Sequence, residues 1–231
     1  EIASLNENCE NNLCFLGGGA YDHFIPAAVK HLTSRSEYYT AYTPYQPEVA
    51  QGTLQAIYEY QTMICELTGM DVANASVYDA GSALGEAALL AVGHKRKNEI
   101  LVSATVNPNY RQIVETYCHG RAITVRAVDW ENGTTNLDDL KEKISKDTAA
   151  VIIQHPNYFG YLEETEKISE LTHQNDALFI TSNDPLSLAL LQPPGEYGTD
   201  IVTGEGQVLG NPLAFGGPYL GIFAATKELL R

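Results

Sequence analysis

The sequence predicts an α/β fold, in which helices cover both faces of a mainly parallel sheet. Three observations support this class. Strand-like apolar runs alternate with amphipathic helical patterns beyond residue 98 of the 231-residue chain. These runs are rich in β-branched residues, as expected for strands buried on both faces. No internal repeat, low-complexity tract or interdomain linker divides the chain, so we expect one large domain.

The first half of the chain predicts two helices separated by a short strand. Apolar residues recur at three- and four-residue spacing from Glu48 to Thr68, and Gly69 is suited to end that helix. The segment "VANASVY" (72–78) follows as a short strand. Small residues then fill "DAGSALGEAALLAVG" (79–93), which predicts a helix that starts near Ala83 and packs closely against a neighbour.

The second half supplies most of the sheet. Because ligands of parallel α/β sheets bind at the carboxyl ends of the strands, we look for functional residues directly after each strand. The expected strands are "EILVS" (99–103), "AITVRAV" (122–128), "AAVIIQ" (149–154), "ALFIT" (177–181) and "DIVTG" (200–204), and the expected helices are "YRQIVETYCHG" (110–120), "LDDLKEKI" (137–144) and "TEKISELTHQ" (165–174).

Composition excludes several classes of partner. The formal charge is −15, and acidic residues are spread along the chain, which argues against nucleic acid because nucleic-acid binding needs a basic surface. The basic run "HKRK" (94–97) is explained as the end of a helix, where the helix dipole stabilises cations. No apolar run approaches the ~20 residues of a membrane helix, and no signal peptide is visible. We therefore expect a cytoplasmic protein without a membrane partner.

The four cysteines show no metal-binding pattern. They form no CxxC pair and have no histidine at zinc-ligand spacing. We expect reduced thiols and no metal site. The cysteines are Cys9, Cys14, Cys65 and Cys118.

Two strand exits carry candidate binding residues. Gly81 and Ser82 stand at the entrance of a helix, where free N–H groups and the positive end of the dipole attract phosphate. The alternative is a tight turn with Ser82 as the N-cap. His155 and Asn157 follow another strand, where Asn157 either caps the turn or touches a ligand and His155 is either structural or part of a site. The late glycine-rich run "GEGQVLG" (204–210) has the wrong spacing for a dinucleotide site.

A stiff, tyrosine-rich segment precedes the first long helix. It reads "YTAYTPYQPEVAQG" (39–52). The Thr43-Pro44 and Gln46-Pro47 pairs favour an extended, rigid backbone. Such a segment presents its phenols at little entropic cost. Further upstream, the triple glycine at 17–19 lets the backbone pass close to another element.

Three motifs resemble the P-proteins of the glycine cleavage system. They are "FLGGGAYDHFIP" (15–26), "YTAYTPYQPEVAQGTLQAIYEYQTMICELTGMDVANAS" (39–76) and "AFGGP" (214–218). The resemblance runs from about Phe15 to the end of the chain. The form "CELTGMDVANASVYDAGSALGEA" (65–87) looks more like subunit 1 of the two-subunit bacterial enzyme, glycine dehydrogenase (decarboxylating), than like the single-chain form.

The resemblance implies an aminotransferase-like (fold type I) large domain of a pyridoxal phosphate (PLP) enzyme, with a mainly parallel seven-stranded sheet. It would span 15–231 after an N-terminal segment, 1–14, and the small C-terminal domain of the family would be missing. Such enzymes hold PLP through a lysine after a late strand and an aspartate after an earlier one. Aligning "SLALL" and "GGP" with the catalytic subunit places Ser182 at the aspartate and Gln207 near the lysine. No Lys or Arg lies between Lys167 and Lys227.

The resemblance therefore implies a non-catalytic subunit with a degenerate pocket and no covalent PLP. The PLP-containing subunit 2 would decarboxylate glycine and transfer the aminomethyl group to the lipoyl group of the H-protein. The implied pocket positions are Gly81, Ser82, His155, Asn157, Ser182 and Gln207. The residues expected to line the partner's active site are Tyr42, Thr43, Tyr45 and Gln46, which could instead pack the subunit interface or cover this chain's own pocket.

Two other functions stay open. One is a degenerate PLP fold that binds a small molecule as a regulatory module. The other is a self-sufficient PLP enzyme whose lysine lies beyond residue 231, although the order of elements argues against it.

Overall fold

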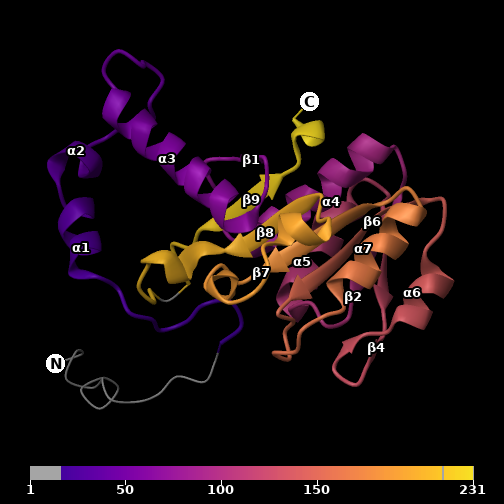
Figure 1. The fold of residues 1–231 in the computed structure, drawn as a ribbon. Coiled ribbons are helices and arrows are strands. Elements are labelled where there is room, and N and C mark those ends of the chain that lie inside the picture. Colours follow the sequence, from indigo (N-terminus) through magenta and orange to yellow (C-terminus); the bar gives the residue numbers. More distant parts are fainter. Residues whose placement is uncertain (1–16, 215, 231) are drawn as a thin grey trace.

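A seven-stranded sheet forms the centre of the computed structural model, which describes residues 17–214 and 216–230 (Figure 1). The strand order is β1-β9-β8-β7-β6-β2-β3. The five strands from β8 to β3 pair in parallel, and β9 and β1 add an antiparallel edge. The strands are β1 (Val72–Ala73), β2 (Glu99–Ser103), β3 (Thr124–Val128), β6 (Thr148–His155), β7 (Leu178–Asn183), β8 (Ile201–Glu205) and β9 (Gly221–Ala225).

Helices cover both faces of this sheet. Alternate strand residues point to opposite faces, so Ile100 packs with helices α4 and α5 while Leu101 packs with α6 and α7. Ile64 of α3 packs on β8 and β9. The helices are α1 (Ala27–Thr33), α2 (Ser36–Tyr39), α3 (Gln51–Thr68), α4 (Ala80–Lys95), α5 (Pro108–His119), α6 (Leu137–Lys143) and α7 (Thr165–Gln174).

Shorter elements complete the fold. A two-stranded hairpin precedes α6, and four 3₁₀ turns follow β7, β8 and β9 among the described residues. Their bounds are β4 (Trp130–Glu131), β5 (Thr134–Thr135), η2 (Ser187–Ala189), η3 (Pro194–Tyr197), η4 (Gly206–Leu209) and η5 (Lys227–Leu229).

The predicted elements are present, with shifted boundaries. The five strands expected in the second half each overlap an observed strand, and Gly69 ends α3 in the left-handed conformation with φ +69°. The strand expected at 72–78 is shorter, because only Val72–Ala73 and a bridge at Val77 pair with β9. The segment 1–14 lies outside the described residues. The domain boundary expected there stays a prediction.

Helix α4 begins earlier than expected, at Ala80. Asp79 is its N-cap and accepts a hydrogen bond from the N–H of Ser82 at 2.7 Å, so the alternative in which Ser82 caps the helix is wrong. The positive end of the helix dipole also stabilises a carboxylate at the N-cap.

The small residues of α4 allow close contact with α5, as the sequence predicts. A Cβ added at Gly85 would lie 2.8–3.0 Å from ring atoms of Tyr117, and one at Gly81 would overlap Ile113. Gly81 therefore has a packing role in this helix pair.

An arm, which we define as residues 22–50, stands apart from the sheet (Figure 1). It contains α1 and α2, neither of which has a buried residue. The rings of Phe24, Tyr39 and Tyr42 are 82–87% exposed. The side chain of Val29 approaches Gly210. Exposed aromatic rings gathered on one segment are typical of an interaction surface.

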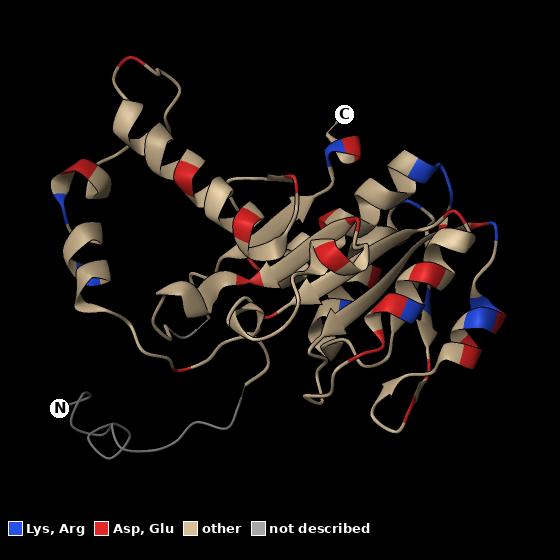
Figure 2. Cartoon of the chain, viewed as in Figure 1, with Lys and Arg blue, Asp and Glu red and all other residues tan. Residues whose placement is uncertain are grey.

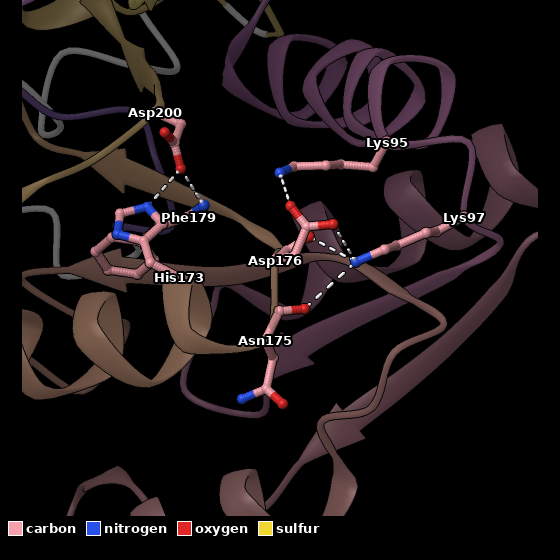
Figure 3. A network of polar contacts seen from close by, with 7 residues as sticks. All are labelled: Lys95, Lys97, His173, Asn175, Asp176, Phe179 and Asp200. Atoms are coloured by element: carbon pink, nitrogen blue, oxygen red, sulfur yellow. Dashed lines mark hydrogen bonds and ion pairs between the residues drawn. The ribbon is translucent and has the colours of Figure 1, made fainter.

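Charged groups are distributed over the whole structure. Acidic residues lie on the arm, the helices and the loops instead of gathering in one tail (Figure 2). The basic run at 94–97 closes α4, as expected, and Lys95 and Lys97 hold Asp176 at N–O distances of 2.6 and 3.2 Å (Figure 3). Hydrogen bonds from these two lysines lower the pKa of Asp176.

A second carboxylate completes this network at the amino ends of β7 and β8. One carboxylate oxygen of Asp200 accepts a hydrogen bond from the Phe179 N–H at 2.7 Å and lies 2.9 Å from Nε2 of His173 (Figure 3). Together the contacts fix the turn between α7 and β7 at the sheet edge opposite the strand exits.

We expect Gly85→Ala to destabilise the protein by about 1–3 kcal/mol, because the rigid Tyr117 ring leaves no room for a methyl group. Gly93→Ala is the matched control in the same helix: an added Cβ meets nothing within 4 Å, so it should stabilise by about 0.5–1 kcal/mol. Urea unfolding of both variants measures the difference. Equal effects would show that the two helices are not in close contact at Gly85.

Candidate functional site

A cavity of about 380 Å³ lies at the carboxyl ends of the parallel strands. The strand ends of β6, β7 and β8 form its floor, the start of α5 forms one wall, and the glycines at 17–19 cross its edge. Of the six predicted pocket residues, Asn157 and Ser182 line this cavity. Gly81, Ser82, His155 and Gln207 are not among its lining residues.

Asn157 caps the turn that follows β6. Its Nδ2 donates to the Gly133 carbonyl at 2.8 Å and to the Glu163 carboxylate at 2.7 Å. Its Oδ1 accepts from the N–H groups of Phe159 and Tyr161 at 3.0 and 3.1 Å. These four bonds use the hydrogen-bonding capacity of the amide. Of the two alternatives for this residue, the structure favours the capping role.

His155 is a buried structural histidine at the end of β6. Its Nδ1 accepts the N–H of Glu163 at 3.1 Å, so the neutral ring carries its proton on Nε2. Burial lowers the pKa of His155, against a smaller opposing effect of the Glu163 carboxylate. The ring packs edge-on against Tyr197.

Gln207 is fully buried and binds the backbone of the N-terminal segment. Its Oε1 accepts the Tyr21 N–H at 2.9 Å, and its Nε2 donates to the carbonyls of Tyr21 and Asn211 at 3.1 and 2.7 Å. Gly19 then passes so close to Tyr110 that an added Cβ would lie 2.5 Å from the phenol oxygen, as the triple glycine predicts. The hydrogen bonds between Gln207 and Tyr21 join residues that are 186 positions apart in sequence and close one side of the cavity.

Glu205 is the residue that the sequence analysis missed. It ends β8 and is 8% exposed. Its carboxylate accepts three backbone N–H groups, from Ala80 at 3.0 Å, Gln207 at 3.0 Å and Leu220 at 2.9 Å. The sequence offered one signal for it: an acidic residue at the end of a buried strand, inside the run "GEGQVLG" (204–210), whose spacing does not fit a dinucleotide site.

The cavity is acidic. Its ionisable lining residues, apart from tyrosines, are Asp184 and Glu205, and among the residues that the structure describes none of its lining is Lys, Arg or His. Burial raises the pKa of Glu205 and of the neighbouring Tyr110. No group of three or more potential metal ligands occurs among the described residues.

The described residues do not fit PLP. The nitrogen of the cofactor's ring needs an acid, and the resemblance implies Ser182, which cannot supply one, at that position. The Gln207 amide is bonded to backbone and cannot replace a lysine amine. The helix end suited to the phosphate already holds two carboxylates, Asp79 and Glu205.

The four residues of the tyrosine-rich loop lie elsewhere. Tyr42 and Tyr45 are 83% and 78% exposed, and their rings pack edge-to-face with centroids 6.4 Å apart. Thr43 and Gln46 are exposed as well. They belong to the arm, and none of the four lines the cavity.

The sequence matches the family model "Glycine cleavage system P-protein" over residues 1–231. The chain belongs to this family. It is 56% identical over 230 residues to a probable glycine dehydrogenase (decarboxylating) subunit 1 of Carboxydothermus hydrogenoformans, and 55% identical to that of Chloroherpeton thalassium. Each comparison covers 100% of this chain and 52% of the relative, so the chain spans about half the length of the curated relatives it matches.

Solved structures agree with this assignment. A crystal structure of glycine decarboxylase (P-protein) in inhibitor-bound form has a TM-score of 0.90 and 44% identity, and covers 99% of this chain and 52% of that chain. A sphingosine-1-phosphate lyase of Burkholderia pseudomallei, at 10% identity and a TM-score of 0.73, shares the fold over 99% of this chain and 57% of its own. The predicted fold class, the large domain of an aminotransferase-like PLP enzyme, is confirmed. No helix in the described part is both long and apolar enough to cross a membrane.

We expect His155 to make stability depend on pH. Because its folded pKa is lowered, its contribution is present above the unfolded pKa of about 6.5 and is lost as the pH falls through the folded pKa. The slope from one proton cannot exceed about 1.4 kcal/mol per pH unit. His155→Asn keeps an acceptor for the Glu163 N–H and should flatten the profile in urea unfolding between pH 5 and 8. The exposed His119→Asn controls for loss of a histidine. An unchanged slope in His155→Asn would contradict this expectation.

Proposed function

We propose that this chain belongs to a cytoplasmic subunit that supports glycine decarboxylation without carrying the reactive cofactor. The observation that carries the proposal is a P-protein fold whose own cavity does not fit PLP. Three features support it: the alignment that the resemblance implies puts Ser182 at the position of the required acid, it puts Gln207 near the position of the lysine, and the Glu205 carboxylate already accepts the Ala80 N–H at the start of α4.

The reactive cofactor then lies in a partner, a PLP-containing subunit 2. The relatives' names, which specify a subunit 1, support such a partner. In the assembled enzyme, glycine would lose CO₂ and the aminomethyl group would pass to the lipoyl group of the H-protein. This chain would contribute structure and surface to that reaction.

The arm is the part of this chain suited to reach the partner. Its prolines, Pro44 and Pro47, reduce the entropy cost of ordering the loop. Tyr42 and Tyr45 present phenol groups that can donate to a carboxylate. We propose that Tyr42, Thr43, Tyr45 and Gln46 line the mouth of the partner's active site and exclude water from the substrate.

The second candidate is a small-molecule-binding or regulatory module. The persistence of a cavity of about 380 Å³ favours it. Co-purification separates the two candidates, because a supporting subunit brings a PLP-containing partner with it and a regulatory module does not.

Borohydride reduction of the assembled enzyme tests where the cofactor is held. We expect the PLP-labelled lysine peptide to come from the partner, since no lysine lies between Lys167 and Lys227 of this chain. Peptide mapping by mass spectrometry gives the answer. A stoichiometric PLP-lysine peptide from this chain would refute the proposed non-catalytic role.

The combined substitution of Tyr42→Phe and Tyr45→Phe tests the arm. A lost hydrogen bond to a charged group costs about 1.5–3 kcal/mol, so glycine-dependent CO₂ exchange should fall by about ten-fold or more. Tyr58→Phe, an exposed tyrosine of α3 outside the loop, is the control and should leave exchange unchanged. Full exchange and unaltered H-protein affinity in the double variant would show that the hydroxyls have only a structural role.

A further inference from the structure

We infer that the Glu205 carboxylate is a built-in anion that occupies the phosphate position of this cavity and thereby excludes phosphate-bearing ligands from it. The inference deepens the proposed non-catalytic role and rests on it, because both hold that no phosphate-bearing cofactor binds in this cavity. The absence of a lysine does not explain why a phosphate-bearing ligand would be excluded. The inference assigns this exclusion to one side chain, that of Glu205.

The first argument is the set of donors around this carboxylate. Three backbone N–H groups point at it: that of Ala80 in the first turn of α4, 125 positions away in sequence, that of Leu220 before β9, and that of Gln207 in η4, for which Glu205 is the N-cap. All three N–O distances are 2.9–3.0 Å, which is normal for strong hydrogen bonds. Converging N–H groups at a helix N-terminus are the arrangement with which proteins bind phosphate. Here a side chain of the protein fills it.

The second argument is charge. Asp79 adds another carboxylate at the same helix end, where it accepts the Ser82 N–H at 2.7 Å. An entering phosphate would meet two carboxylates, and two first-turn donors would already be in use. Burial raises the pKa of Glu205 and repulsion from Asp79 adds to this, whereas the three backbone hydrogen bonds lower it and favour the anion. The same two carboxylates would repel a phosphate dianion.

The third argument is that the segments leave little room to rearrange. A Cβ added at Gly221 would overlap the Asp79 carbonyl, and one at Gly206 would overlap Leu220. Val77 and Gly221 are also joined by backbone hydrogen bonds at 2.9 Å. Because the donors are held in place by this backbone packing, removal of the Glu205 side chain should leave an empty anion site rather than a collapsed one.

Glu205→Ala in the full-length protein, assembled with its partner, tests the inference with inorganic phosphate as the probe. We expect the variant to be less stable than the wild type in chloride, and to regain stability as phosphate replaces chloride at constant ionic strength. At 100 times the dissociation constant, a site on the folded state raises the folding constant about 100-fold. The wild type should show no such response, and it also corrects for any phosphate binding elsewhere.

Glu205→Gln is the matched control, because it removes the charge but keeps the side-chain volume in the site. It should lose stability without a response to phosphate. If Glu205→Ala is insoluble, its refolding yield with and without phosphate replaces the melting curve, and phosphate should raise the yield. A lack of phosphate response in Glu205→Ala, or equal responses in the wild type or in Glu205→Gln, would overturn the inference. Such a failure would leave the lysine-peptide result intact, so it is distinguishable from failure of the proposed function.

Discussion

Buried carboxylates that accept N–H and O–H donors hold the strand-exit loops of this fold together. Glu205 joins α4, η4 and the approach to β9 through three backbone N–H groups. Glu163, which is 6% exposed, accepts from the Thr105 hydroxyl, the Asn157 amide and the Thr135 N–H at 2.7–2.8 Å. Neither carboxylate forms an ion pair among the described residues. Several donors to one buried charge compensate for its desolvation, whereas an unpaired charge would be costly.

Glu205 lines the cavity, and Glu163 is bonded to another of its lining residues, Asn157. Glu163 joins β5 to the turn that follows β6, and Glu205 joins the start of α4 to the end of β8. These hydrogen bonds hold parts of the cavity wall together. A PLP enzyme would need some of these donors for its cofactor, so the fold of the family does not by itself establish cofactor chemistry in this chain.

The sequence predicts what depends on local pattern. The alternation of apolar runs and amphipathic helices locates the parallel strands, Gly69 marks the end of α3, and the small residues of α4 indicate close packing. It does not predict contacts between distant segments. Glu205 and Ala80 are 125 positions apart, and Gln207 and Tyr21 are 186 apart, so no periodicity in one segment can reveal either pair. The cap of α4 was misplaced because Asp79 and Ser82 are both good N-cap residues, and only geometry decides between them.

Polar residues at the strand exits fall into two groups, and the difference decides what the cavity can bind. Asn157 and Gln207 have their amide groups engaged by backbone and side-chain partners, so their residue types suggested a ligand while their geometry uses them for the fold. Ser182 and Asp184 line the cavity at the end of β7, and one carboxylate oxygen of Asp184 accepts the Leu186 N–H. The polar capacity that remains is rich in acceptors and acidic. It is the reverse of what an anionic cofactor requires, because a phosphate group is bound by N–H donors and cations.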